Sequence, residues 1–447
     1  MKYFKELNFC IFLFLVLNLR FNIDFYLSLG ISLFIYNGLK LIFNCNDYLP
    51  FIELMLSLFG LQYLFGPAII YLNEDLIPES YTMKVSSDIY FSFIIPIYLA
   101  FSLGLNAFIR SNKLKVNLDS INQFYNQNKF LPYILISIGL ISTLLIFYLP
   151  SALQFIAYLL SSLKFVGVFI LLLGDSNKSN KIIILVYSLI IISSFVGGMF
   201  HDLLIWIILL CLLLCLKYRP SLRFKFIIIF ILITFVVLLQ SIKGAMRLRT
   251  WFGNESMSIG LLVSVIKEVN EDKDGLYNIE NLPILAIRIN QGWIVSLVME
   301  NVPSIVKHTH GELTNIYFQS AFLPRFLRKY KLMTGDQNIF TKFSGKDLNQ
   351  GTAMCLGLFS DAYIEFGKYG AIIFIFTFGA FYSYILKKFV INSRKYPILI
   401  LFVLIAFNYV IRPDNDTQTA IAHLFKSIFL IYIGFKIFKR WLILKTI

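Results

Sequence analysis

The sequence predicts an all-α polytopic membrane protein with about 12 transmembrane helices and one large extracytoplasmic loop. Of its 447 residues, 58% are hydrophobic and only 15% are charged, whereas a soluble protein carries about 25% charged residues. The mean hydropathy is +0.75. Most of the chain therefore crosses lipid, and its length does not imply several soluble domains.

Apolar runs of membrane length define the predicted spans. They lie near residues 8–19, 25–43, 49–73, 85–109, 131–149, 151–173, 182–199, 203–216, 226–243, 367–386, 397–411 and 419–435. Several are shorter than the roughly 20 residues that a straight helix needs to cross a bilayer. The first run follows Lys2 and Lys5 and has no small-residue cleavage site after it, so we expect a retained anchor rather than a removed signal peptide.

Charge sorts the connections between these runs into two sets. The basic set comprises residues 110–129, 217–225, 387–396 and the C-terminal tail, and the acidic set comprises residues 74–84 and 412–418. When the spans are threaded in order, every basic connection falls on one side. The positive-inside rule then predicts a multi-pass protein of the cell inner (cytoplasmic) membrane with both termini in the cytoplasm.

The same threading divides the chain into three parts. Residues 1–243 form the N-terminal transmembrane part of about nine helices, residues 244–366 form the outer loop, and residues 367–447 hold about three further helices. The outer loop carries 12 Lys and Arg against 12 Asp and Glu, so the net charge of +15 lies elsewhere in the chain. That charge is a signal of topology, and it is not accompanied by the aromatic basic platform of a nucleic-acid-binding protein.

The outer loop is the predicted active-site region because it combines apolar and charged segments. Residues 255–271 are amphipathic, residues 283–302 are nearly apolar, and residues 333–352 are rich in Gly, Asp and Asn. We expect interfacial helices over the first two segments and an irregular loop over the third.

Basic residues gather at three places around this loop, and Arg is well suited to grip phosphate oxygens. The predicted diphosphate-binding residues are Arg247 and Arg249 where the ninth span emerges, Arg288 within the apolar segment, and Arg325 and Arg328 after Pro324. The anionic ligands rich in such oxygens at this boundary are polyprenyl-pyrophosphate lipids. Two alternatives stay open: Arg247 and Arg249 could snorkel to headgroups, and Arg328 could belong to an ordinary headgroup patch.

Acids and histidines supply candidates for a base that takes a proton from an acceptor hydroxyl. His310 and Glu312 suggest a base and the group that orients it, or else a solvated polar turn. Asp361 and Glu365 stand one helical turn apart and share a face, which also suits a capping or surface role. His201 and Asp202 lie between the seventh and eighth predicted spans at the outer face, and they could close the active-site cavity from the other side. No metal-ligand or cofactor signature is found, since Cys211 and Cys215 have no further ligands nearby.

An ordered set of residues runs from this loop into the next span. The set is Arg288, Gly292, Trp293, Gly311, Tyr317, Pro324, Arg325, Asn338, Gly351, Thr352, Gly357, Asp361, Tyr363, Phe366, Gly367 and Gly370. Over roughly residues 285–390 this order resembles the oligosaccharide repeat-unit polymerases, that is, the Wzy-type O-antigen and capsule polymerases. Asp361 and Glu365 depart from the family pattern, in which Glu and Asn are expected, and the aromatic and Lys-Pro that often follow Pro-Arg are absent here.

The resemblance implies a GT-C-like membrane glycosyltransferase that polymerises undecaprenyl-pyrophosphate-linked oligosaccharide repeat units into surface polysaccharide. It implies no nucleotide sugar, metal or cofactor, and as partners membrane lipids, a chain-length regulator and a flippase. Two other functions use similar chemistry: an O-antigen ligase, and a flippase or transporter of the same lipid-linked oligosaccharide. A transporter would need a polar path through the spans, which offer few ionisable groups beyond Asp88 and Lys164.

Overall fold

The computed structural model describes residues 2–438, apart from 147, 175–178, 198–199, 253–259, 262, 266, 268–285, 323–331 and 350–351. Throughout these residues the regular structure is helical, without strands. The helices are α1 (Lys2–Leu15), α2 (Phe25–Asn44), α3 (Phe51–Gly60), α4 (Gly66–Leu72), α5 (Ser87–Leu105), α6 (Leu118–Gln127), α7 (Leu131–Leu145), α8 (Ser151–Ser161), α9 (Leu163–Leu173), α10 (Ser179–Gly197), α11 (His201–Tyr218), α12 (Leu222–Phe252), α16 (Gly292–Asn301), α17 (Glu312–Phe322), α18 (Gln337–Ser344), α19 (Leu358–Ser393), α20 (Leu399–Ala406) and α21 (Thr417–Ile437).

Eight helices in the described part of the chain are long and apolar enough to cross a membrane, or nine if one bent pair counts as a span. They cover Phe25–Asn44, Phe51–Leu72, Ser87–Leu105, Leu153–Leu173, His201–Tyr218, Leu222–Leu239, Leu358–Ser393 and Thr417–Ile437. The protein is therefore an all-α, multi-pass membrane protein. Each of the eight overlaps a run that the sequence predicts to span.

Four predicted spans differ from this simple form, and the full count of twelve stays a prediction. The run at 8–19 falls on the 14-residue α1 and a following π-helical turn, and the run at 182–199 contains a shorter apolar helix, Asn180–Ser194. The run at 131–149 holds α7, which is bent by 85° from the helical segment before it. The run at 397–411 contains α20, whose eight residues rise only about 12 Å.

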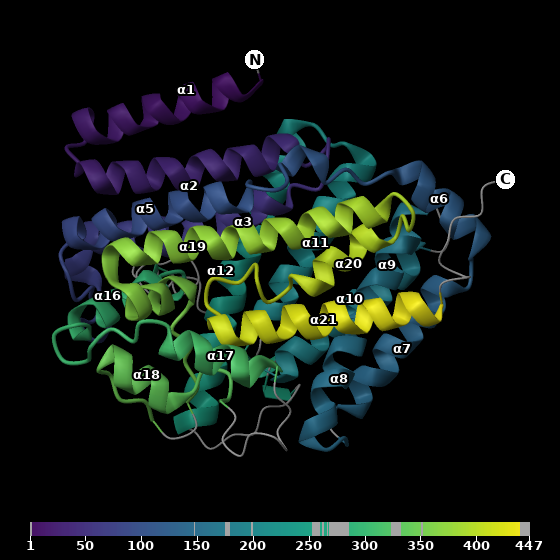
Figure 1. Cartoon of the computed structure of the whole chain (residues 1–447). Coiled ribbons are helices and arrows are strands. Elements are labelled where there is room, and N and C mark those ends of the chain that lie inside the picture. Colours follow the sequence, from purple (N-terminus) through teal and green to yellow (C-terminus); the bar gives the residue numbers. More distant parts are fainter. Residues whose placement is uncertain are drawn as a thin grey trace.

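The segment around α20 nevertheless brings the chain back along α19. The end of α19 leads into α20, and α20 lies beside both α19 and α21 (Figure 1). Residues 407–416 then continue as turns, and Thr417 at the start of α21 donates hydrogen bonds to Asp361 in the first turn of α19. The start of α19 and the start of α21 are thereby joined.

Helices α5 and α19 pack closely against each other in the core. A Cβ at Gly104 of α5 would stand 2.4 Å from the carbonyl oxygen of Phe376 in α19, and one at Gly379 would stand 2.9 Å from the carbonyl oxygen of Phe101. Small residues let two helix backbones approach in this way inside a membrane. Phe359 at the start of α19 extends the contact, since its ring lies 4.5 Å from that of Tyr63 in the π-helical turn between α3 and α4.

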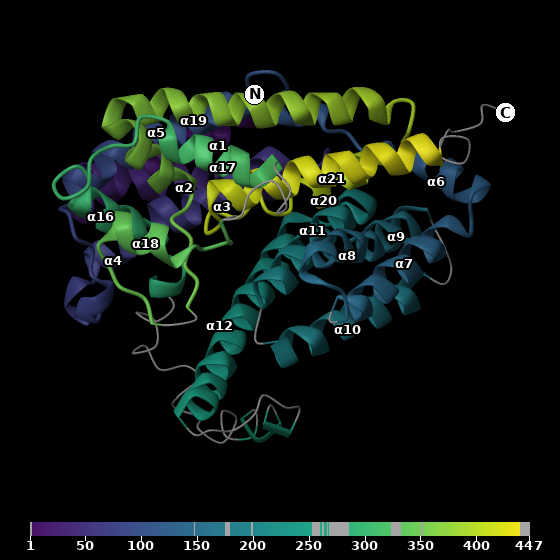
Figure 2. The same cartoon turned by 60° about the horizontal axis from the view of Figure 1, so that its bottom comes forward.

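Helices α7 to α10 form a second group beside this core (Figure 2). Figure 2 shows α7 to α10 together below α20 and α21, and it shows α12 running obliquely away from them. The short helices α16, α17 and α18, which come from the predicted outer loop, gather at the end of the molecule where α19 begins (Figures 1 and 2). The candidate site lies at that end.

Candidate functional site

Glu365 of α19 is a buried carboxylate that holds the start of α17. Its side chain is fully buried, and it accepts a hydrogen bond of 2.6 Å from the Thr309 hydroxyl. It also accepts hydrogen bonds from the backbone N–H groups of Gly311 and Thr314 in the first turn of α17. A carboxylate in this position satisfies free N–H groups and complements the positive end of the helix dipole.

A bend in α19 at Gly367 makes these contacts available. Gly367 has φ 63° and ψ −164°, a conformation essentially restricted to glycine. The loop before α17 donates hydrogen bonds to backbone carbonyls near this bend. The Thr309 N–H donates to the Ile364 carbonyl at 3.1 Å, and the His310 N–H donates to the Glu365 carbonyl at 3.0 Å. His308 Nδ1 lies 3.1 Å from the Tyr363 carbonyl oxygen, so the polar groups at the bend are occupied.

Asp361 lies one helical turn before Glu365 and joins three helices. Its side chain is only 1% exposed. It accepts hydrogen bonds from the Tyr317 hydroxyl of α17 at 3.0 Å and from the Thr417 hydroxyl of α21 at 2.6 Å. Burial, together with the Asp361 carboxylate, raises the pKa of Tyr317 well above its ordinary value, so this phenol stays protonated and remains a donor.

A small pocket opens beside this network, with a volume of about 10 Å³. Tyr317, Asp336, Cys355 and Asp416 contribute to its wall. Asp416 caps α21 by accepting from the Thr419 N–H at 2.6 Å, and it also accepts from the Gly335 N–H at 3.0 Å. Burial and the nearby Asp416 raise the pKa of Cys355, which keeps it a thiol and makes it unsuited to nucleophilic attack.

A second polar cluster links α11 to the segment that precedes α21. The guanidinium of Arg412 is almost fully buried and pairs with Asp202 at 2.5 Å, while its Nε donates to the Asn408 carbonyl at 3.0 Å. His201 Nδ1 lies 2.9 Å from Asp414 Oδ2. The sequence pointed to His201 and Asp202 but missed Arg412, although an Arg between apolar residues in a short acidic connection was the signal that could have identified it.

The charge environment lowers the pKa of Asp414. Burial alone would raise this pKa, but the hydrogen bond and charge of His201, followed by the charge of Arg412, outweigh burial and hold it below its ordinary value. The cluster therefore stabilises the charged form of this carboxyl.

The predicted base and its predicted orienting group are both placed at the surface of the site. His310 and Glu312 are exposed, and among the residues that the structure describes no hydrogen bond joins their side chains. His310 has a positive φ of 48°, which is uncommon for a residue with a side chain. Its backbone N–H is held by Glu365, and its ring centroid lies 6.3 Å from that of His308. The structure thus brings His310 to Glu365 and Asp361 to Tyr317.

The described part of the structure does not bring the predicted diphosphate-binding arginines together. Arg288 is exposed near α16, and Arg249 in the last turn of α12 donates to the Ser264 hydroxyl at 3.2 Å. Arg247 also lies in α12, but its side chain lies outside the described part, as do Arg325 and Arg328 altogether. In this part of the chain no three His, Cys, Asp or Glu side chains are arranged to hold a metal ion.

The described residues on either side of 323–331, the range that contains Arg325 and Arg328, contact α21. Before it, the ring of Phe322 lies 4.6 Å from that of Phe425. After it, the carbonyl oxygen of Leu332 accepts a hydrogen bond of 3.1 Å from Gln418. Both flanking residues are therefore anchored on the helix that supplies Thr417 to the Asp361 network.

Comparison with known proteins gives one result. The model of a family described as a domain of unknown function (DUF8712) matches residues 79–446, which is most of the chain and includes every element of the site. No curated protein and no solved structure matches the chain.

Proposed function

The chain belongs to the DUF8712 family, whose description states no activity, and we propose that it is a membrane glycosyltransferase that polymerises undecaprenyl-pyrophosphate-linked oligosaccharide repeat units. The proposal includes the finer points that the resemblance implies: a Wzy-type polymerase with a GT-C-like arrangement, acting at the outer face of the cytoplasmic membrane. Its support comes from three motif residues that meet around the start of α19. Tyr317 donates a hydrogen bond to Asp361, and Gly367 bends α19 a few residues further on.

The observation that carries the proposal is the way in which Glu365 presents His310. The carboxylate of Glu365 holds Thr309 and Gly311 on either side of His310, and its carbonyl holds the His310 N–H. The His310 side chain itself stays exposed, on a backbone in the left-handed region. Strained, over-determined backbone with a free titratable side chain is typical of functional sites.

In the proposed reaction His310 is the general base. It takes the proton from an acceptor hydroxyl of one repeat unit while that oxygen forms a bond to the anomeric carbon of the other repeat unit. The bond between that carbon and the diphosphate oxygen breaks, and undecaprenyl diphosphate leaves with the electron pair. Glu365 is a positioning residue, and Glu312 adds negative charge beside the imidazolium.

Arginines are proposed to stabilise the leaving diphosphate. Arg288 is exposed. Phe322 and Leu332, which flank the range that contains Arg325 and Arg328, contact α21, and the first residue of α21 bonds to Asp361. A guanidinium that meets the growing charge of a leaving diphosphate would lower the barrier electrostatically. Asp361 is proposed to hold α17, α19 and α21 in their relative positions near these arginines.

The test is gel analysis of surface glycan in a strain that lacks the native gene and carries a variant. His310→Gly removes the imidazole and suits the positive φ, so we expect an unchanged or higher melting temperature but loss of the long glycan ladder, since general-base catalysis contributes about 10²–10⁴-fold. Lys307→Ala, at a nearby exposed position, is the control and should keep the ladder.

The banding pattern separates the competing functions. A single repeat unit on the final acceptor in the null strain indicates a polymerase. Absence of any glycan on that acceptor indicates a ligase, and lipid-linked units trapped on the cytoplasmic face indicate a flippase. Long glycan ladders in the His310→Gly variant would show that His310 is not the general base.

A further inference from the structure

The ring of His308 presents an oriented hydrogen-bond acceptor beside the bend of α19. Its Nδ1 lies 3.1 Å from the Tyr363 carbonyl oxygen and 3.3 Å from the Ile364 carbonyl oxygen. A carbonyl oxygen only accepts, so Nδ1 carries the hydrogen, and in the neutral imidazole Nε2 then holds a lone pair. Within the described part of the chain, this Nε2 has no hydrogen-bond partner. The backbone thus fixes which nitrogen of His308 is free to accept.

The glycine at the bend keeps that nitrogen uncovered by α19. A Cβ at Gly367 would stand 3.2 Å from Nε2 of His308 and 3.3 Å from its Cε1. The φ of 63° at Gly367 also disfavours a side chain there. The Tyr363 ring meets the imidazole edge to face, with the two ring centroids 5.7 Å apart, and His308 as a whole is half-buried. The ring is therefore held firmly while Nε2 stays available.

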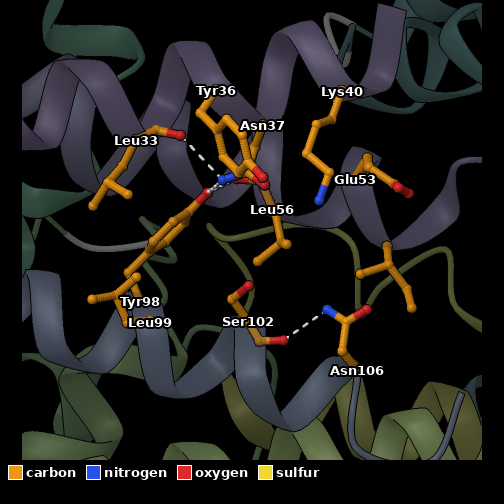
Figure 3. Close-up of a pocket in the computed structure, with 11 residues that line it drawn as sticks. Leu33, Tyr36, Asn37, Lys40, Glu53, Leu56, Tyr98, Leu99, Ser102 and Asn106 are labelled. Carbon is orange, nitrogen blue, oxygen red and sulfur yellow. Dashed lines mark hydrogen bonds between the residues drawn. The ribbon is translucent and has the colours of Figure 1, made fainter. Parts of the chain in front are cut away.

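The polar groups of a pocket between α2, α3 and α5 are engaged differently (Figure 3). This pocket has a volume of about 90 Å³. In it, the Asn37 amide donates to the Leu33 carbonyl at 3.1 Å and to the Tyr98 hydroxyl at 2.9 Å, as the dashed lines in Figure 3 show. The Glu53 carboxylate accepts from the Ser111 hydroxyl. These polar side chains hold the pocket's own helices together, whereas Nε2 of His308 serves no such contact.

His310, the proposed base, lies beside this acceptor. The two imidazole centroids are 6.3 Å apart, and the two rings are inclined by 62°. The His310 side chain is exposed. Hydrogen bonds of about 3 Å from two adjacent hydroxyl groups of one sugar ring can meet both imidazoles across a gap of this size.

We propose that His308 and His310 together bind the acceptor sugar through two neighbouring hydroxyl groups, that is, through a vicinal diol. His310 takes the proton of the attacking hydroxyl, as described above. Nε2 of His308 accepts a hydrogen bond from the adjacent hydroxyl, which keeps its proton. The inference rests on the proposed glycosyl transfer and specifies its acceptor: the carbon next to the attacking hydroxyl carries a free hydroxyl. An acceptor without that second hydroxyl would leave Nε2 unpaired at the site, which disfavours its binding.

The test is modification of histidine with diethyl pyrocarbonate, which acylates unprotonated and uncovered ring nitrogens. Mass spectrometry of the full-length protein in detergent measures the rate at each histidine. The probe is the oligosaccharide repeat unit released from the cell's own lipid carrier. We expect His308 and His310 to be modified, and about tenfold more slowly when the probe is present at about ten times its Kd.

The other two histidines are internal controls. His201 pairs with Asp414 through Nδ1 and is 39% exposed, so it should be modified at the same rate with and without the probe. His423 is 1% exposed and should stay unmodified. Absence of modification at His308, or modification that the probe does not slow, would overturn the inference.

His308→Asn separates binding of the acceptor from support of the bend. The asparagine amide can donate to the Tyr363 carbonyl in place of Nδ1, but it puts no acceptor at the position of Nε2. With the lipid-linked repeat unit as donor and the released oligosaccharide as acceptor, the KM for the acceptor should rise about tenfold while kcat stays within about twofold. Lys307→Asn, at the exposed neighbouring position, is the matched control and should keep the native KM.

The two measurements distinguish this inference from the proposed function. A native KM in His308→Asn would overturn the inference even in a protein that polymerises the repeat unit. Slower modification of both histidines by the probe, in a protein that transfers no sugar, would contradict the proposed function and support the contact of the glycan with both rings.

Discussion

At the scale of single residues, the site depends on backbone conformations that few side chains allow. Gly357 has a φ of 88°, and a Cβ there would stand 2.5 Å from the Tyr63 hydroxyl oxygen. Gly367 makes the bend in α19, and a Cβ there would stand 3.2 Å from His308 Nε2. His310 adopts a positive φ despite its side chain. Of these three, only the glycines have the conformational freedom that their positions require.

Gly367→Ala is expected to destabilise the fold by about 1–3 kcal/mol, because alanine disfavours this φ and its methyl group would press on His308. Thermal unfolding of the detergent-solubilised protein measures the change. Gly434→Ala is the control: Gly434 lies in α21, where a Cβ would have no neighbour within 4 Å, so no loss of stability is expected. Equal melting temperatures for the two variants would contradict the role assigned to the bend.

At the scale of elements, α17 is attached to α19 through two buried carboxylates. Glu365 holds its first turn, and Asp361 holds Tyr317 near its middle. The one-turn spacing of these acids puts both on the face of α19 that meets α17. Buried carboxylates are costly unless several donors satisfy them, and here hydroxyl and backbone N–H groups do so.

Glu365→Gln is therefore expected to lower stability by about 2 kcal/mol, because one carboxylate oxygen becomes an NH₂ group that faces backbone donors. Glu312→Gln, at an exposed position in the same turn of α17, should change stability little. Chemical denaturation followed by tryptophan fluorescence compares the two variants. If both lose the same amount, Glu365 does not carry the attachment of α17.

At the scale of the whole molecule, the His201–Asp414 and Arg412–Asp202 pairs connect α11 to the C-terminal segment. That segment in turn delivers Thr417 to Asp361, so the polar cluster supports the geometry of the site from outside it. Arg412 is the buried member of these pairs, so removing Asp202 would leave its charge uncompensated, which makes this link important for the assembled helices.

The lowered pKa of Asp414 predicts a dependence of stability on pH. A carboxyl whose pKa is lower in the folded state contributes stability that is fully present above its unfolded pKa, about 3.9, and is lost as pH falls through the lower folded value. The melting temperature of Asp414→Asn should therefore lie below that of the native protein above about pH 4, and the difference should shrink in more acidic buffer. A difference that grows on acidification would contradict this assignment.

Only part of the candidate site could be predicted from the sequence. Helical spacing placed Asp361 and Glu365 on one face, but their partners Tyr317 and Thr417 come from distant segments. The sequence suggests His310 and Glu312 as a base and the group that orients it, whereas the described structure links His310 to Glu365 through its backbone. The arginines Arg325 and Arg328 lie outside the described residues, so their predicted role remains a prediction.

The sequence by itself determined that this is a helical, multi-pass membrane protein, because hydropathy over about 20 residues is a local property of the chain. Only the tertiary structure decided how a segment as short as α20 is accommodated and that Arg412 pairs with Asp202. It alone showed that Glu365 presents His310. These features depend on which distant helices meet, and buried polar groups find their partners across such contacts rather than along the chain.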